Sequence, residues 1–428
     1  KTWLLVSRML RLLLAGAAPA ELLAITFTRK AAQEMTDRLH AWLRVLALED
    51  DATVRAFLLE RKVAEEDLDA LLPRARGLLE AVLTATPGPT VTTFHGWFLD
   101  LLKRAPLEAG LPWGAPLLER TRQLQDEVRD RLLAKWAMSP ESAAGQALRA
   151  LLADIGEHNL RALLRHFLDA RAEWWAYTDG AADPVAFALD ALRPLLHADL
   201  ERDPVADFWA DAERVAQVKR VGHALEKGSK TEAERGRAIV DAATLDPDAA
   251  HAVLTTRLMT AGARRKKQAT KELEKALGAG LDAYLRDLDA VETALEGIAA
   301  VRTDQRIWAL NRHGLLLGHA LLDAYQDAKA QQGVIDFNDA EWLACRLLQD
   351  EVHAPALALK LDARYTHLLL DEFQDTNPLQ WQALSTWLAE ARQAEGDNAD
   401  RTMTVFMVGD PKQAIYRFRR GEARVFDA

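Results

Sequence analysis

Three carboxylates stand directly behind a run of apolar residues in "LLLDEFQDTNPLQW", residues 368–381. Burying an unpaired carboxylate is costly, so a bound cation is one reason to place acids at the end of a buried strand. Mg²⁺ binds through one or two carboxylates together with the phosphates of a substrate. We therefore expect Asp371 to bind Mg²⁺, usually through water, and Glu372 to orient and deprotonate an attacking water molecule.

A second strand-like run, "VGDPKQAIYRFRRG" (residues 408–421), also ends in an acid and continues with a lysine and a glutamine. Gln413 could donate a hydrogen bond to a terminal phosphate. Tyr416 and Phe418 alternate with arginines, including Arg419, which is typical of a surface where bases stack and cations meet the nucleic-acid backbone. Core packing is the alternative interpretation of these aromatic residues, and the alternation with arginine favours nucleic-acid contact.

The chain begins "KTWLLVSRML", a lysine and a threonine followed by an amphipathic helical pattern. A phosphate-binding loop reads G-x-x-x-x-G-K-[ST] and opens a helix whose amino end cradles phosphate. With acid-bearing strands downstream, we expect Lys1 to contact the β- and γ-phosphates of ATP and the Thr2 hydroxyl to bind Mg²⁺. The glycines of the loop would then lie upstream of Lys1.

Four short segments must position these groups. Each is nearly continuous in apolar and β-branched residues, as parallel strands covered on both faces are, and each ends in polar residues. Ligands of open α/β sheets gather at the carboxyl ends of the strands. The sequence therefore predicts an α/β fold with a parallel sheet built from residues 22–28, 90–95, 367–373 and 404–410.

The middle of the chain has a different pattern. From about residue 105 to residue 333, Ala, Leu, Arg, Glu and Asp recur at helical spacing without strand-like runs. This predicts a large all-helical insertion in the α/β core. We expect residues 1–105 to form the first part of the core, residues 106–335 the insertion, and residues 336–428 the second part.

One basic run lies in the expected insertion, "ARRKKQATKELEK" at residues 263–275. Its cations could contact the phosphates of duplex DNA, each contact adding salt-sensitive affinity. Acidic residues follow directly, so a solvated helix face is the favoured interpretation.

Composition narrows the class of protein. A chain of 428 residues exceeds one ordinary core, and a net charge of −10 gives no overall attraction to nucleic acid or anionic lipid. The single cysteine, Cys345, excludes an internal disulfide and a Cys-based zinc site, and we expect it to be buried. No apolar run approaches the length that spans a bilayer, so we expect no membrane association and a reduced, cytoplasmic setting.

Five stretches together resemble a known family. "ITFTRKAAQEM" (25–35), "TTFHGW" (92–97), "VIDFNDA" (334–340) and the two acid-bearing stretches above occur in the order found in superfamily 1A DNA helicases of the UvrD/Rep type. The long segment before "VIDFNDA" and the wording "GDPKQAIYRFR" look most like the RecB and AddA helicase–nuclease subunits. The resemblance implies a RecA-like P-loop NTPase core with a parallel sheet, interrupted by the helical insertion.

The resemblance also implies roles for residues on the DNA side. Thr26, Phe27 and Thr28 match positions that touch single-stranded DNA, and His95 matches a residue near the same strand. Thr28 is expected to cap a helix as well. Tyr416 and Phe418 match the aromatic residues on which bases stack.

On the nucleotide side, Gln374 matches the glutamine that links the ATP site to DNA, and Asp375 would support it. Gln413 matches the sensor of the γ-phosphate. The family further implies a second RecA-like domain beyond Ala428, which supplies arginines to the ATP site, and an adenine-contacting segment upstream of Lys1. Residues 1–428 are therefore expected to hydrolyse ATP poorly or not at all by themselves.

The expected parent protein is an ATP-dependent DNA helicase or translocase with 3′→5′ polarity, acting in double-strand break repair and recombination at the bacterial nucleoid. Its partners would be single-stranded DNA, the junction with duplex DNA and a further component of a helicase–nuclease complex. Two alternatives remain. A DNA-binding scaffold with a degenerate ATP site would not need a water-activating Glu372. A metal-dependent nuclease using Asp371, Glu372 and Asp375 normally needs a lysine on an adjacent strand.

Overall fold

The computed structural model describes residues 2–106, 114–196, 199–260, 262–395 and 403–410. The chain divides into two compact units. We call them the sheet unit (Lys1–Arg131, Arg165–Asp179 and Leu321–Ala428) and the helical unit (Leu132–Leu164 and Gly180–Ala320). The domain boundaries expected from the sequence, at residues 105–106 and 335–336, stay a prediction.

The sheet unit contains a four-stranded sheet in which every neighbouring pair is parallel, as predicted. Ala24 lies opposite Val91 on one neighbouring strand and opposite Leu369 on the other. Each strand ends two or three residues before the predicted run does. The strand order is β2 (Thr90–Thr93), β1 (Leu22–Thr26), β5 (His367–Leu370) and β6 (Thr404–Met407).

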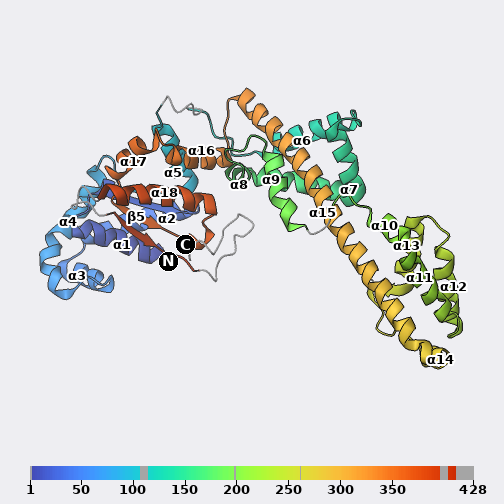
Figure 1. The fold of residues 1–428 in the computed structure, drawn as a ribbon. Helices are drawn as coiled ribbons and strands as arrows, with labels where there is room; N and C mark the ends of the chain where they lie inside the picture. Colours follow the sequence, from blue (N-terminus) through green and yellow to red (C-terminus); the bar gives the residue numbers. More distant parts are fainter. Residues whose placement is uncertain (1, 107–113, 197–198, 261, 396–402, 411–428) are drawn as a thin grey trace. The chain divides into compact units, whose positions relative to one another are not determined.

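Helices bury both faces of this sheet, which removes the apolar side chains of the strands from water. Side chains alternate along β1, so Leu22 and Ala24 pack into one cluster, while Leu23 and Ile25 pack into the other. Figure 1 shows α18 on one side of the strands and α1 on the other. The first face is covered by α1 (Thr2–Ala15), α2 (Arg29–Leu48), α3 (Asp51–Glu60) and α4 (Leu68–Thr84). The second is covered by α5 (Phe94–Arg104), α8 (Arg171–Tyr177), α16 (Phe337–Gln349), α17 (Ala354–Asp362) and α18 (Pro378–Glu395).

The helical unit has a core of its own, formed by apolar side chains from α10 to α15. The very long α15 (Leu281–Gln332) continues from this unit into the sheet unit, and α7 (Ala143–Asp169) bends at Gly156, whose φ is +77°. The remaining helices are α6 (Arg122–Ala137), α9 (Pro184–Leu192), α10 (Pro204–Ala210), α11 (Ala212–Leu225), α12 (Lys230–Ala242), α13 (Pro247–Leu258) and α14 (Lys271–Leu277).

The expectation of an all-helical middle needs one local correction. Two short strands, β3 (Met259–Thr260) and β4 (Ala263–Arg264), pair antiparallel. Gly262 adopts a φ of +80° between them, a conformation that glycine reaches without steric cost. The basic run is therefore not one helix face, because only its last part belongs to α14.

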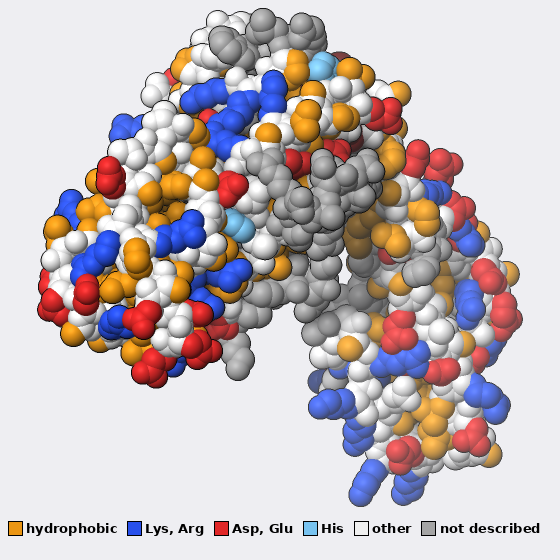
Figure 2. Space-filling model, turned by 90° about the vertical axis from the view of Figure 1, so that its left-hand side faces the viewer, with side chains coloured by type: hydrophobic (Ala, Val, Ile, Leu, Met, Phe, Trp, Pro, Cys, Tyr) orange, Lys and Arg blue, Asp and Glu red, His pale blue; other side chains and the backbone are white. Residues whose placement is uncertain are grey.

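Acidic, basic and hydrophobic side chains are interspersed over the face shown in Figure 2. Cys345 is buried in the sheet unit, and burial raises the pKa of its thiol to about 12. Of the helices described, none is both long and apolar enough to cross a membrane.

Candidate nucleotide and nucleic-acid site

Asp371 is the first residue after β5, at the carboxyl edge of the sheet. Its side chain is almost fully buried, with 3% of the residue exposed. Its N–H donates to the Ile25 carbonyl at 2.9 Å, and its Oδ2 accepts a hydrogen bond from Thr26 Oγ1 at 3.5 Å. Its other oxygen, Oδ1, accepts from the Glu372 N–H at 3.0 Å. These contacts hold one carboxylate at the point where β1 and β5 both end.

Glu372 has an unusual backbone. Its φ of +50° lies in the left-handed region, which a non-glycine residue adopts at a cost of about 1–3 kcal/mol. The turn continues into η6 (Phe373–Asp375). The Glu372 side chain is half-buried, and its Oε2 accepts from Gln374 Nε2 at 2.7 Å. Such strain clusters at functional sites, where the surrounding structure maintains it.

Gln374 is buried and bridges two strand ends. Its Nε2 donates to Glu372 and, at 3.4 Å, to Asp375 Oδ2. Its Oε1 accepts from the backbone N–H of Asp410, which follows β6, at 2.9 Å. One amide side chain therefore connects the carboxylate beside Asp371 to the segment that begins "GDPKQ".

The chain after β6 runs beside the turn after β5. The Val408 N–H donates to the Leu370 carbonyl at 2.9 Å, and the Phe373 N–H donates to the Val408 carbonyl at 3.1 Å. The two acid-bearing stretches are thus brought together as far as Asp410. Gln413, Tyr416, Phe418, Arg419 and also Lys1 lie outside the described residues, and their roles stay predictions.

The direction of α1 follows from its connection to β1. Only residues 16–21 separate the end of α1 from the start of β1, so the carboxyl end of the helix lies near the amino edge of the sheet. The helix packs along the sheet face in one cluster with Leu22 and Leu369, and the Arg8 guanidinium lies 5.9 Å from the Phe406 ring centroid. Its amino end, with Thr2, therefore points toward the carboxyl edge, where Asp371 lies.

This donor set fits Mg²⁺ bound to a nucleotide. Magnesium usually keeps several waters and takes one or two protein oxygens along with phosphate oxygens. The buried carboxylate of Asp371 at a strand end would supply one such oxygen, and the hydroxyl of Thr2 at the start of α1 would supply a second. Among the described residues, no group of three or more His, Cys, Asp and Glu side chains forms a protein-only metal site.

The residues expected to contact DNA follow β1 and β2. Thr26 is fully buried and directs its hydroxyl toward Asp371, whereas Phe27 is half-buried and Thr28 is exposed. Thr28 caps α2 as expected, because its Oγ1 accepts from the Ala31 N–H at 3.1 Å. If this segment binds DNA, Phe27 and Thr28 are its accessible side chains, whereas Thr26 is buried and contacts Asp371 at the carboxyl edge of the sheet.

His95 lies in the first turn of α5, with its ring centroid 4.8 Å from that of Phe337 in an edge-to-face contact. Burial lowers the pKa of His95 from 6.5 to about 4, so the imidazole is neutral at pH 7. Contact with DNA would therefore use a neutral donor or the ring face. This contact joins "TTFHGW" to "VIDFNDA", which the sequence alone did not connect.

Sequence reasoning missed a group of buried ions around "VIDFNDA". Asp336 pairs with Arg171 and with Lys329, and Lys329 pairs also with Asp339. The spacing of Asp336 and Asp339 is that of a capping box, and the structure shows one. That spacing was the available signal, and nothing near Arg171 in the sequence pointed to it.

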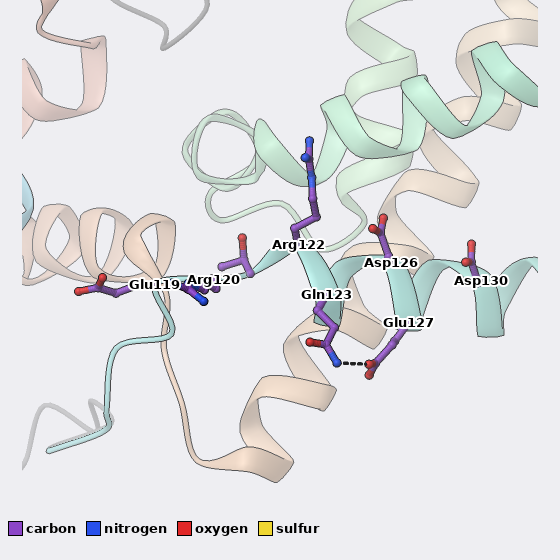
Figure 3. A pocket seen from close by; sticks show the side chains of 8 residues that line it. Glu119, Arg120, Arg122, Gln123, Asp126, Glu127 and Asp130 are labelled. Carbon is purple, nitrogen blue, oxygen red and sulfur yellow. Dashed lines mark hydrogen bonds between the residues drawn. The ribbon is translucent and has the colours of Figure 1, made fainter.

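A surface hollow in the sheet unit was not predicted either (Figure 3). Its carboxylates are engaged by neighbours: Gln123 donates to Glu127 at 2.9 Å, and Arg29 pairs with Glu119 at 2.7 Å. We assign it no role. It is lined by Glu119, Arg120, Thr121, Arg122, Gln123, Asp126, Glu127 and Asp130.

Comparison with known proteins places the chain among helicases. A family model described as the UvrD/REP helicase N-terminal domain matches residues 1–428. A protein of Desulfitobacterium hafniense, named as the A subunit of an ATP-dependent helicase/nuclease, is 40% identical over 123 residues, 27% of this chain and 8% of the relative. Proteins of the same name from Oceanobacillus iheyensis and Levilactobacillus brevis are each 24% identical over the whole chain, which covers 34% and 33% of their lengths. The chain thus spans about a third, or less, of the length of these relatives.

Proposed function

Because the chain belongs to the family of UvrD/REP helicase N-terminal domains, we propose that it forms the ATP-binding part of an ATP-dependent DNA helicase or translocase. The observation that carries this proposal is the arrangement at the carboxyl edge of the sheet. A buried Asp371, a strained Glu372 and a bridging Gln374 stand where a nucleotide would meet the sheet. The relatives named as helicase/nuclease proteins support the same activity for the full protein.

Each residue has a part in ATP hydrolysis. Thr2 and Asp371 would hold Mg²⁺, which would neutralise charge on the triphosphate, and Lys1 would contact the β- and γ-phosphates. Glu372 takes a proton from the attacking water as a general base. Gln413 contacts the γ-phosphate. A second RecA-like domain completes the site with arginines.

Gln374 is the residue suited to pass the state of the nucleotide to the DNA side. It holds the Glu372 carboxylate with one end of its amide and the Asp410 backbone with the other. The segment after Asp410 carries Tyr416, Phe418 and Arg419, which we propose grip single-stranded DNA together with Phe27, Thr28 and His95. Movement requires that this grip differ between nucleotide states.

The setting we propose is a bacterial helicase–nuclease with a partner protein, moving 3′→5′ on DNA in double-strand break repair and recombination. The resemblance of the motifs to RecB and AddA supports this, as does the shared name of the relatives. The proposed substrate is single-stranded DNA and its junction with duplex DNA.

Glu372→Gln in the full-length protein tests the proposal. The amide keeps the shape of the side chain but cannot accept the proton, so DNA-stimulated ATP hydrolysis should fall about 10²- to 10⁴-fold. Binding of a fluorescent ATP analogue and of single-stranded DNA should stay close to wild type. Glu390→Gln, on α18, is the matched control and should hydrolyse ATP normally.

Undiminished hydrolysis by Glu372→Gln would remove Glu372 from its assigned role. A wild-type protein that binds ATP and DNA without hydrolysis would instead support the scaffold alternative. Cleavage of DNA that survives removal of ATP but is lost in Asp371→Asn would support the nuclease alternative.

A further inference from the structure

The amino end of α16 contains a balanced cluster of buried charges. Arg171 and Lys329 are each 1% exposed, and Asp336 and Asp339 are also buried. The Asp336 carboxylate contacts the Arg171 guanidinium and accepts from Lys329 Nζ at 3.0 Å and from the Tyr325 hydroxyl at 3.0 Å. Two cations face two anions, which is the condition under which buried ions remain charged.

The two cations come from the segments through which the chain passes to and from the helical unit. Arg171 opens α8 in the segment Arg165–Asp179, which lies in sequence between the two parts of that unit. Lys329 lies near the end of α15, shortly after the second part of the unit ends at Ala320. Both connecting segments are therefore joined within the sheet unit to the residue that caps α16.

Two further contacts connect α16 to the segment after β5 and to the motif around His95. The buried Glu341 accepts a hydrogen bond from Asn377 Nδ2 at 2.5 Å. Asn377 follows Asp375 by two residues, and its Oδ1 accepts from the Gln380 N–H at 2.8 Å in the first turn of α18. Phe337, the first residue of α16, packs against His95. One helix thus contacts the start of α18, two residues after the turn that carries Gln374, and the motif expected to meet DNA.

We propose that α16 is the coupling element of this domain, with Asp336, Glu341 and Asn377 as positioning residues that transmit DNA binding to the nucleotide edge. The proposal rests on the proposed helicase function. The buried ions fix the amino end of α16 to both connecting segments, because separating one ion from the cluster leaves a buried charge unpaired. The Glu341–Asn377 bond then sets the position of the turn containing Gln374 relative to that anchored helix.

The test uses Glu341→Met in the full-length protein, with Glu341→Gln as the conservative variant. Met fills the space but accepts no hydrogen bond from Asn377, whereas Gln still can. We expect basal ATP hydrolysis without DNA to stay close to wild type and stimulation by single-stranded DNA to fall about tenfold in Glu341→Met. Glu341→Gln should restore most of the stimulation, and DNA affinity should change little in either variant.

Asp362→Met is the matched control. Asp362 also accepts a side-chain hydrogen bond across the same apolar core, from Trp387 Nε1 at 2.8 Å, but it lies on α17 and not on α16. Its loss should lower the melting temperature without changing the ratio of stimulated to basal hydrolysis. Equal loss of that ratio in Asp362→Met and Glu341→Met would overturn the proposal, because a general loosening of the core would then explain both.

A second variant covers the case in which Glu341→Met does not fold. Asn377→Ser keeps an oxygen that can cap α18 but is too short to donate to Glu341 in the same way, so it should fold and lose stimulation. Full stimulation in folded Asn377→Ser would also overturn the proposal. Absence of basal hydrolysis in the wild-type protein would count against the proposed function instead, which keeps the two failures distinguishable.

Discussion

The sheet unit and the helical unit place their charged side chains differently. In the sheet unit, Arg171, Lys329 and Asp336 are buried in one cluster, and Asp371 is buried at a strand end. In the helical unit, ion pairs such as Arg220–Asp287, at 2.8 Å, lie at the surface. Burying an ion costs several kcal/mol of desolvation, whereas exposed pairs contribute about 0–1 kcal/mol. The difference indicates that the sheet unit keeps charged side chains buried at two places, the start of α16 and the end of β5, where they hold segments in position.

The helical unit does bury two carboxylates, and both have mainly neutral partners. Glu232 completes the capping box of α12 with Ser229 and accepts from Thr270 Oγ1 at 2.8 Å; burial tends to raise its pKa, but these hydrogen bonds lower it. Glu292 accepts from Gln268 at 3.0 Å, and burial raises its pKa. Glu232 joins the starts of α12 and α14, and Glu292 joins α15 to the segment before α14, so these carboxylates connect segments through neutral hydrogen-bond donors and not through ion pairs.

The largest expected effect is that of Arg171→Met. Removing one cation leaves Asp336 underpaired in a buried site, so the free energy of unfolding of the sheet unit should fall by about 3–5 kcal/mol. Native-state hydrogen exchange of the β1 and β5 amides measures this unit separately from the other. Arg220→Met in the helical unit should change the exchange of α11 amides by less than about 1 kcal/mol.

The double variant Arg171→Met/Asp336→Leu sharpens this result. Replacing both partners by apolar residues removes the unpaired charge. The double variant should therefore lose less unfolding free energy than the sum of the losses in the two single variants. The contrast between the units would be contradicted if the losses of unfolding free energy in the two single variants were strictly additive. It would also be contradicted if Arg171→Met and Arg220→Met lost equal unfolding free energy.

The second prediction concerns pH. The pKa of His95 is lowered from 6.5 to about 4 by burial, so the unfolded chain binds a proton in this range that the folded protein does not. The contribution of His95 to the free energy of unfolding is complete above pH 6.5. It is lost as the pH falls toward 4, by up to about 3 kcal/mol. His95→Gln should flatten this part of the pH profile of β1 exchange.

The helical unit offers a matched control for the pH profile. Burial, followed by the nearby Arg302 charge, lowers the pKa of His251 as well. His251→Gln should therefore alter the profile of amides in α13 and leave that of β1 unchanged. A wild-type sheet unit with no loss of stability between pH 6.5 and 4 would refute the assignment for His95.

The sequence predicted those features that depend on local patterns. Continuous apolar runs followed by polar residues predicted all four parallel strands, and the two sheet faces follow from their alternation. The same patterns placed Asp371 and Glu372 at a strand end, whereas the nucleotide roles expected for Lys1 and Thr2 stay predictions. The family resemblance added the expectation that Gln374 links the ATP site to DNA, which stays a prediction, and its bridge between two strand ends was found only in the structure.

Features that depend on distant segments were not predicted. Arg171 and Asp336 are far apart in sequence, and composition alone favours exposure for both, so no local rule pairs them. The Phe337–His95 contact and the Glu341–Asn377 bond have the same character. The β3–β4 hairpin was not predicted because its strands are too short to show an alternation with a period of two.

A smaller effect is expected at the helix caps. Thr28→Ala removes the side-chain cap of α2, and Asp211→Ala removes that of α11 in the helical unit, where Asp211 Oδ1 accepts from the Glu213 N–H at 2.9 Å. Each change should cost about 1 kcal/mol of unfolding free energy. Only Thr28→Ala should also weaken binding of single-stranded DNA, measured by fluorescence anisotropy. Equal DNA affinity in both variants would remove Thr28 from the proposed DNA surface.

The smallest effect is expected for Arg264→Met in the basic run. Arg264 contacts Asp289 at 2.5 Å and Glu296 at 2.9 Å, so its charge is already compensated by α15 and is poorly placed to bind DNA phosphates. Its substitution should leave the unfolding midpoint of the helical unit nearly unchanged at high salt, because exposed pairs are screened. Duplex affinity should not change either, whereas Lys266→Ala/Lys267→Ala, at two adjacent exposed lysines of the run, tests whether the run binds DNA at all. If the Arg264 change reduces the salt dependence of duplex affinity, a surface charge in the helical unit is functional. The contrast between the units would then have to be narrowed to buried ion pairs, such as Arg171–Asp336.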